Sequence, residues 1–166
     1  GCARRDEATI GTPENPLIVL LSPAHSPANG AATLAFMKKH LETATGMTVE
    51  VKVADTQSGA INKFGSDEAD AGLVTVEEYL VAREEYGMRA ELQVLRGNNQ
   101  SSYEGVILSR TVTKIPELAG KKVGFVGPYS VSGFTLPSIF PKKAGIKVQP
   151  EFSSGHDANL KKLMEG

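Results

Sequence analysis

Apolar positions in the first half of the chain alternate between short continuous runs and a helical spacing. Leu17–Leu21 is a continuous apolar run, which is typical of a strand buried on both faces of a parallel sheet. Apolar residues then recur at helical spacing over 34–44, and Gly46 marks the end of that helix. The same alternation predicts, in order, a strand over 49–53, a short helix over 60–64 ending at Gly65, a strand over 69–74, a helix over 76–83 ending at Gly87, and a strand over 92–95.

A polar segment, GNNQSS, interrupts this pattern after Arg96. Beyond it the pattern predicts strands over 103–108, 122–126 and 146–152, a helical turn over 115–118, and helices over 135–143 and 159–164. Strands that alternate with helices indicate a doubly wound α/β lobe. The second lobe, at about 60 residues, is small for an independent core, and we expect the sequence to be the front part of a longer protein.

These elements predict four regions along the chain. They are a flexible leader over 1–15, a first α/β lobe over 16–97, a hinge connector over 98–103 and a partial second α/β lobe over 104–166. The leader carries neither a helical nor a strand period.

The stretch 122–137 joins a strand to a helix through a loop of small residues. Together with Lys121 it reads KKVGFVGPYSVSGFTLP. Gly127 and Pro128 end the strand, and Ser130–Gly133 lead into a helix that we expect to start near Phe134. The first N–H groups of a helix have no internal partner, and the helix dipole favours negative charge there. An oxyanion therefore fits this loop. The alternative is that Ser130 or Ser132 is simply an N-cap.

The hydrogen bonds of this loop alone give barely enough free energy for tight binding of an oxyanion, so we expect other residues to contribute. About four charge-assisted hydrogen bonds at about 1.5–3 kcal/mol each give a gross attraction of roughly 6–12 kcal/mol. Micromolar binding requires about 8 kcal/mol net.

Other polar loops follow the remaining strands: SPAHSPA, DTQSG, TVEE and SSGH. Ligands of open α/β sheets bind at the carboxyl ends of strands, so these loops indicate a small-molecule cleft. Ser22 or His25 could face that cleft, and a solvated loop is the alternative.

Composition and charge exclude several classes of function. The 166 residues carry 18 basic and 19 acidic side chains and a formal net charge of -1, which gives no electrostatic reason to expect nucleic acid. No apolar run approaches the roughly 20 residues of a membrane span. The frames of a serine hydrolase and of a Walker loop are missing, and three scattered histidines with one cysteine do not make a zinc site. We therefore expect a protein that is not an enzyme and that uses no cofactor or metal.

Cys2 is the single cysteine, and it follows Gly1 at the start of the polar leader. This arrangement resembles the region just after a bacterial lipoprotein cleavage site, in which a small residue precedes the cysteine that receives the lipid. A surface thiol without such a role is the alternative. If Cys2 carries a lipid, residues 3 to about 15 act as a flexible tether.

Four segments together resemble the phosphonate- and phosphate-type substrate-binding proteins of ABC importers, the PhnD-like group. They are SYEGVILSR at 102–110, LAGKKVGF at 118–125, PYSVSGFTLP at 128–137 and SGHDANLKKLMEG at 154–166. The front half agrees through a TG at Thr45 and Gly46, EADAGLV and TVEEYLVA, so the resemblance spans about 16–166. It implies a two-lobed clamshell of the type II periplasmic-binding-protein fold that closes on an oxyanion.

The resemblance also implies roles for individual residues. The family's phosphonate cradle, a serine-threonine-serine-glycine loop, matches Ser130, Val131, Ser132 and Gly133. Valine at the middle position removes one hydroxyl but keeps its N–H. A ligand-contacting tyrosine of the family matches Tyr103. A lone histidine is more often structural, but the glycine-histidine motif of the family matches His156 and points to the ligand.

A second family tyrosine aligns near Gln57, which can form hydrogen bonds but provides no aromatic wall. The acidic residues that hold the amine of an aminophosphonate in the family lie beyond Gly166. The ligand therefore stays open among an aminophosphonate, phosphate, phosphite and a small alkylphosphonate.

The resulting prediction is a substrate-binding protein that captures a small phosphorus oxyanion between two lobes and delivers it to an ABC permease. Its expected location is the periplasm or the outer face of the cytoplasmic membrane, with the membrane contacted only through a lipid on Cys2. The alternatives are a ligand-sensing module of a signalling receptor with the same fold and an enzyme acting on phosphate esters.

Overall fold

The run Leu17–Leu21 forms strand β1 at the centre of a parallel sheet. The computed structural model describes residues 5–95 and 97–166, and in this part of the chain β1 lies between β2 (Val49–Val53) and β3 (Ala71–Leu73). Both neighbours run parallel to it. Leu20 and Leu21 are almost completely buried, as expected for a central strand covered on both faces.

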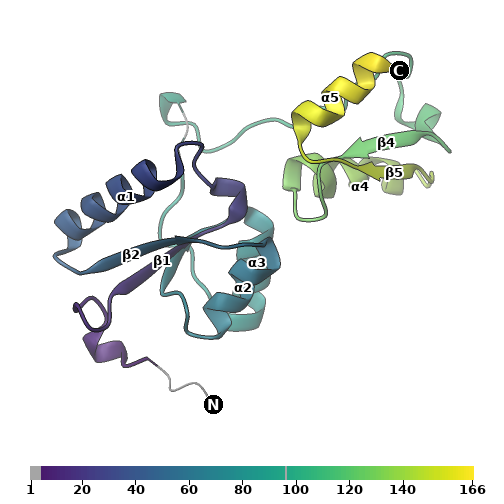
Figure 1. Cartoon of the computed structure of the whole chain (residues 1–166). Helices are drawn as coiled ribbons and strands as arrows, with labels where there is room; N and C mark the ends of the chain where they lie inside the picture. Colours follow the sequence, from purple (N-terminus) through teal and green to yellow (C-terminus); the bar gives the residue numbers. More distant parts are fainter. Residues whose placement is uncertain (1–4, 96) are drawn as a thin grey trace. The chain divides into compact units, whose positions relative to one another are not determined.

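Three helices cover this sheet: α1 (Gly30–Thr45) on one side, and α2 (Gln57–Gly65) and α3 (Val76–Tyr86) on the other (Figure 1). The predicted helix ends at Gly46 and Gly87 are confirmed, because both glycines adopt the left-handed conformation with φ of 70°. No helix within 5–95 and 97–166 has the length and apolar content needed to cross a membrane.

The core of this first unit lies between the sheet and α2. It is built from buried residues of β1 and of the segments around α2, with partly buried neighbours packed against them: Leu20, Ala54, Ala60 and Ala69, then Ile18 and Phe64. Ala60 and Phe64 of α2 belong to this core, so the helix that follows β2 is held against the sheet.

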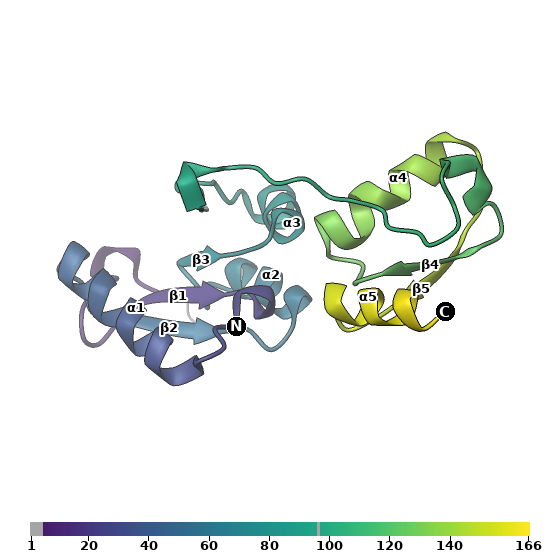
Figure 2. The same cartoon turned by 90° about the horizontal axis from the view of Figure 1, so that it is seen from above.

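A second parallel sheet pairs β4 (Lys122–Phe125) with β5 (Gln149–Phe152). A π-helical turn, Val131–Thr135, follows β4 and continues into α4 (Leu136–Lys143), and α5 (His156–Glu165) follows β5. Helices α4 and α5 lie on opposite sides of these strands (Figure 2). The helical turn predicted over 115–118 is confirmed as a 3₁₀ helix, Ile115–Leu118.

The chain divides into two compact units, Gly1–Ala90 and Glu91–Gly166. Each unit is a parallel sheet flanked by helices, as predicted for an α/β lobe. The division falls before the connector predicted at 98–103.

Two predicted strands are wrong. Neither 92–95 nor 103–108 forms a strand, although both carry the apolar residues of one. Leu92 is 95% exposed and Val106 is 71% exposed. A strand requires a neighbour that accepts and donates its backbone hydrogen bonds, and neither segment joins either described sheet.

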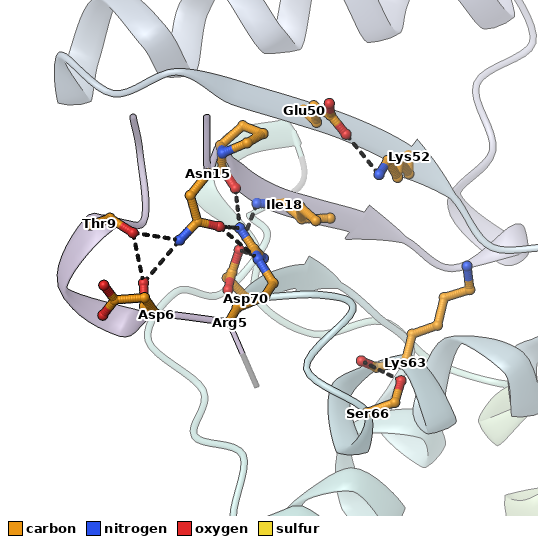
Figure 3. Close-up of polar contacts among 11 residues, drawn as sticks. Arg5, Asp6, Thr9, Asn15, Ile18, Glu50, Lys52, Lys63, Ser66 and Asp70 are labelled. Atoms are coloured by element: carbon orange, nitrogen blue, oxygen red, sulfur yellow. Dashed lines mark hydrogen bonds and ion pairs between the residues drawn. The ribbon is translucent and has the colours of Figure 1, made fainter. Parts of the chain in front are cut away.

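The described part of the predicted flexible leader, residues 5–15, is fastened to the first unit, and we call it the arm. Arg5 donates to the Asn15 Oδ1 atom from two nitrogens (2.9 and 2.7 Å), to the Pro16 carbonyl, and to the Asp70 Oδ2 atom at 2.7 Å (Figure 3). The same Asp70 oxygen accepts the Ile18 N–H at 2.7 Å. The Thr48 N–H donates to the Gly11 carbonyl at 2.7 Å. The arm therefore lies along the edge where β1 begins, and it departs from the tether expected for this segment.

We expect Arg5→Ala to release the arm. The side chains of Arg5 and Asp70 are only 20% and 16% exposed, so solvent screens their ion pair only in part. Its loss, together with that of its hydrogen bonds, should cost about 1–3 kcal/mol. Hydrogen exchange of residues 5–15 measures the release. The matched control is Arg83→Ala, which removes an exposed ion pair with Glu84. Equal exchange of the arm in both variants would contradict this account.

Candidate functional site

The stretch between β4 and α4, residues 126–133, is called the serine loop. Ser130 has an extended backbone (φ −106°, ψ 112°), and its Oγ accepts the Gly133 N–H at 3.1 Å. Its carbonyl accepts the N–H groups of Phe134 and Thr135 at 2.9 and 3.0 Å. Ser130 is therefore the N-cap of the helix, which was the alternative left open for this position.

This cap sets which groups face outward. The helix begins at Val131 rather than near Phe134, so the N–H groups of Val131 and Ser132 lie in its first turn, where helical geometry leaves N–H groups without internal acceptors. The Gly133 N–H, in contrast, is engaged by Ser130. The open end therefore offers the backbone N–H groups of Val131 and Ser132, and the loop also contains the hydroxyls of Ser130 and Ser132.

Gly133 is held by close packing beneath the loop. A Cβ atom at this position would lie 2.6 Å from the Val126 Cγ2 atom and 2.8 Å from the Ser130 Oγ atom. The Gly133 carbonyl also accepts the Val126 N–H at 3.1 Å. The loop therefore folds back on the end of β4, and only glycine fits.

His156 lies at the same edge of this sheet as the serine loop. Because β4 and β5 are parallel, with Phe125 opposite Phe152, both loops follow the carboxyl ends of their strands. The Ser153 N–H donates to the Phe125 carbonyl at 2.9 Å and extends the pairing by one step. His156 is the first residue of α5 and is exposed.

The segment that contains Tyr103 passes beside the serine loop. A Cβ atom on Gly105 would lie 3.9 Å from the Ser132 carbonyl oxygen, which is ordinary van der Waals contact. The Tyr103 ring itself is exposed. The second unit thus brings the predicted residues Ser130–Gly133, His156 and the neighbourhood of Tyr103 to one edge.

Three phenylalanines support this edge from below, and the sequence analysis did not assign them to the site. Phe125 contacts Phe134 edge to face at 5.2 Å between ring centroids, and Phe152 lies 5.2 Å from Phe134 and 6.1 Å from Phe125. Phe134 follows the serine loop directly, so the cluster fixes the start of the helix against both strands. The sequence signal for this cluster was a phenylalanine at the last position of each strand and another directly after the loop.

Gln57 lies in the first unit, whereas the residues above belong to the second. It is half-buried and begins α2, directly after the N-cap Thr56, whose Oγ1 accepts the Gly59 N–H at 2.9 Å. Ser22 and Thr75 follow β1 and β3 at the same carboxyl edge of the first sheet. Cys2, the predicted lipid site, lies outside the described residues.

Comparison with known proteins identifies the family. Residues 19–166 match the family model described as ABC transporter, phosphonate, periplasmic substrate-binding protein. The chain belongs to this family.

A solved structure supports the fold of this chain. A binding protein component of an ABC phosphonate transporter from Pseudomonas aeruginosa matches with a TM-score of 0.61 and 16% sequence identity, over 90% of this chain. The chain spans 53% of that structure. The match confirms the predicted periplasmic-binding-protein fold, and an incomplete second lobe fits the covered share of that structure. A search of functionally curated proteins gave no match.

The family also bears on two other predictions, that the protein is not an enzyme and that it lies in the periplasm or at the outer face of the membrane. The family consists of binding proteins of ABC transporters and not of enzymes, in agreement with the prediction. The family is periplasmic, which implies an extracytoplasmic location. Among residues 5–95 and 97–166, no three His, Cys, Asp or Glu side chains gather closely enough to hold a metal ion.

The serine loop carries no charged side chain of its own, so the partial positive charge that it offers an anion is that of the helix start. Residues 126–135 contain no charged side chain. Lys122, at the opposite end of β4, lies 2.9 Å from Glu151. The hydrogen bond between them lowers the pKa of the Glu151 carboxyl and raises the pKa of Lys122. The loop can therefore hold an anion by hydrogen bonds at a helix start, as phosphate-binding loops do.

Proposed function

We propose that this chain captures a small phosphorus oxyanion at the serine loop and delivers it to an ABC permease. The observation that carries the proposal is the uncharged helix start after β4, with the N–H groups of Val131 and Ser132 in its first turn. The Ser132 hydroxyl is a further donor in the proposal. His156, at the same edge of the sheet, is a further donor in the proposal. Tyr103 is its proposed aromatic contact, because its segment passes beside Ser132.

The first unit contributes Gln57 in this proposal, from the start of α2 at the carboxyl edge of its own sheet. An oxyanion that binds a closed arrangement of the lobes more tightly than an open one shifts the population toward the closed form, in proportion to that preference. We propose that the permease receives this closed form.

The proposed ligand is phosphate, phosphite, a small alkylphosphonate or an aminophosphonate. Val131 lacks the hydroxyl of the family cradle, and Gln57 replaces an aromatic wall, so a ligand with few substituents suits these residues as well as an aminophosphonate does. A lipid on Cys2 is the proposed anchor at the outer face of the cytoplasmic membrane.

Calorimetric titration of the full chain at fixed ionic strength tests the function. The ligands are phosphate, phosphite, methylphosphonate, 2-aminoethylphosphonate and sulfate. The proposal expects at least one phosphorus oxyanion to bind and sulfate to bind much more weakly. Binding of sulfate alone, or of none of the five, would overturn it.

For the ligand that binds, we expect Ser132→Ala to weaken affinity by about 1–3 kcal/mol, because one charge-assisted hydrogen bond is lost. Ser138→Ala is the matched control, since Ser138 lies in α4 and its hydroxyl donates to the Thr135 carbonyl at 2.9 Å. Equal affinities of the two variants would remove the serine loop from the site.

A further inference from the structure

Ser22 and Glu78 form a buried polar pair in the first unit. Both side chains are completely buried, and the Ser22 hydroxyl donates to the Glu78 Oε1 atom at 2.7 Å. The two residues are distant in the sequence, since Ser22 follows β1 and Glu78 lies in the first turn of α3. Burying a carboxylate costs free energy unless its oxygens accept hydrogen bonds, so Glu78 needs the Ser22 hydroxyl as a donor.

Ser22 sets the first turn of the β1–α1 loop, residues 22–29. Its N–H donates to the Leu73 carbonyl at 2.9 Å, which extends the pairing of β1 with β3 by one residue. Its Oγ accepts the Ala24 N–H at 3.2 Å while its hydroxyl proton is given to Glu78. The direction in which the loop leaves the sheet is therefore fixed by the atom that Glu78 holds.

The other oxygen of Glu78 closes the start of α3. Glu78 Oε2 accepts the Thr75 N–H at 2.7 Å, and the Thr75 Oγ1 atom accepts the Glu78 N–H at 3.4 Å, which together form a capping box.

We propose that Glu78 is a positioning residue for ligand binding. Its carboxylate joins the loop after β1 to the loop after β3, at the carboxyl edge where ligands of open parallel sheets bind. Glu78 is buried and touches no ligand itself; it acts through Ser22 on the β1–α1 loop. This inference rests on the proposed function.

The test uses the full chain and methylphosphonate as the probe. Ser22→Ala removes the hydroxyl that links the loop to Glu78 and leaves the cap of α3 in place. Glu78→Gln leaves one acceptor oxygen for two donors. The matched controls lie at the opposite end of the sheet. Ser66→Ala removes a serine that donates to Glu68 at 2.8 Å, and Glu42→Gln changes a carboxylate that accepts from Lys38 and from the Val49 N–H.

Calorimetry at a temperature well below unfolding measures Kd, and hydrogen exchange follows residues 22–29. We expect Kd to rise roughly three- to thirty-fold in both Ser22→Ala and Glu78→Gln. Exchange of the loop should become faster in both, while the two controls change neither quantity. Because both residues act through one hydrogen bond, the double variant should bind little more weakly than the weaker single variant.

Two results would overturn the inference. Variants that lower the melting temperature but leave Kd unchanged would show that the pair serves stability alone. Unchanged exchange of residues 22–29 would show that Glu78 does not hold the loop. A wild-type chain that binds none of the five anions instead contradicts the proposed function, and the positioning role falls with it.

Discussion

Gly133→Ala is expected to abolish most oxyanion binding by the chain. The added Cβ atom would lie 2.6 Å from Val126 and 2.8 Å from the Ser130 Oγ atom, so the serine loop must move away from β4. That movement breaks the cap on the Gly133 N–H and turns the donors of Val131 and Ser132 away from a common point. Loss of two charge-assisted hydrogen bonds weakens binding by at least about 3 kcal/mol, which is more than a hundred-fold in Kd.

Gly127→Ala is the matched control for this prediction. Gly127 is the second residue of the same loop, but a Cβ atom there would have open space around it. Calorimetric titration of both variants with the anion that binds best measures the difference. If Gly133→Ala binds as tightly as Gly127→Ala, the geometry of the loop is not what holds the ligand.

Phe125→Ala is expected to cost about 3–5 kcal/mol of stability in the second unit. Phe125 is 2% exposed and contacts both Phe134 and Phe152, so its removal leaves a cavity beneath the serine loop. Urea unfolding, together with hydrogen exchange of residues 122–152, measures the loss. Binding should fall with it, because Phe134 directly follows the loop.

Phe140→Ala removes an equal ring from α4, where it is 55% exposed. Its cost should stay within about 1 kcal/mol, as is usual for surface positions. Similar losses of stability in the two variants would contradict the view that the phenylalanine cluster supports the loop.

The hydrophobic pattern predicted the first unit well because its helices satisfy their own hydrogen bonds and its strands find partners in the described sheet. β1, β2 and the three helices lie where the apolar spacing places them, and glycines at 46 and 87 end two of the helices. The pattern failed for 92–95 and 103–108. It reports only which residues prefer a strand, whereas a strand also needs a partner, and the described residues give these segments none.

The candidate site was predictable in its location but not in its internal bonding. A serine- and glycine-rich turn after a short strand pointed to the helix start after β4. The sequence could not decide that Ser130 caps the helix and engages Gly133, since both serines carry the same hydroxyl. It also gave no sign that Arg5 fastens the arm through Asp70, because that contact joins residues far apart in the chain.

The same limit applies to the pairing of Ser22 with Glu78. Each residue has an ordinary local explanation, as a loop serine and as the acidic member of a capping box. Only the pairing of β1 with β3, which places Ser22 near the start of α3, brings them within hydrogen-bonding distance. Long-range polar contacts of this kind leave no periodic signal in the sequence.

We have proposed that the serine loop holds a phosphorus oxyanion. Titration of the ¹⁵N-labelled chain, followed by NMR, tests this directly. Methylphosphonate is added in one series and sulfate in another at the same ionic strength. The account predicts large amide shifts at Val131 and Ser132 with methylphosphonate and small ones with sulfate. Shifts confined to other segments, or equal shifts with both anions, would contradict it.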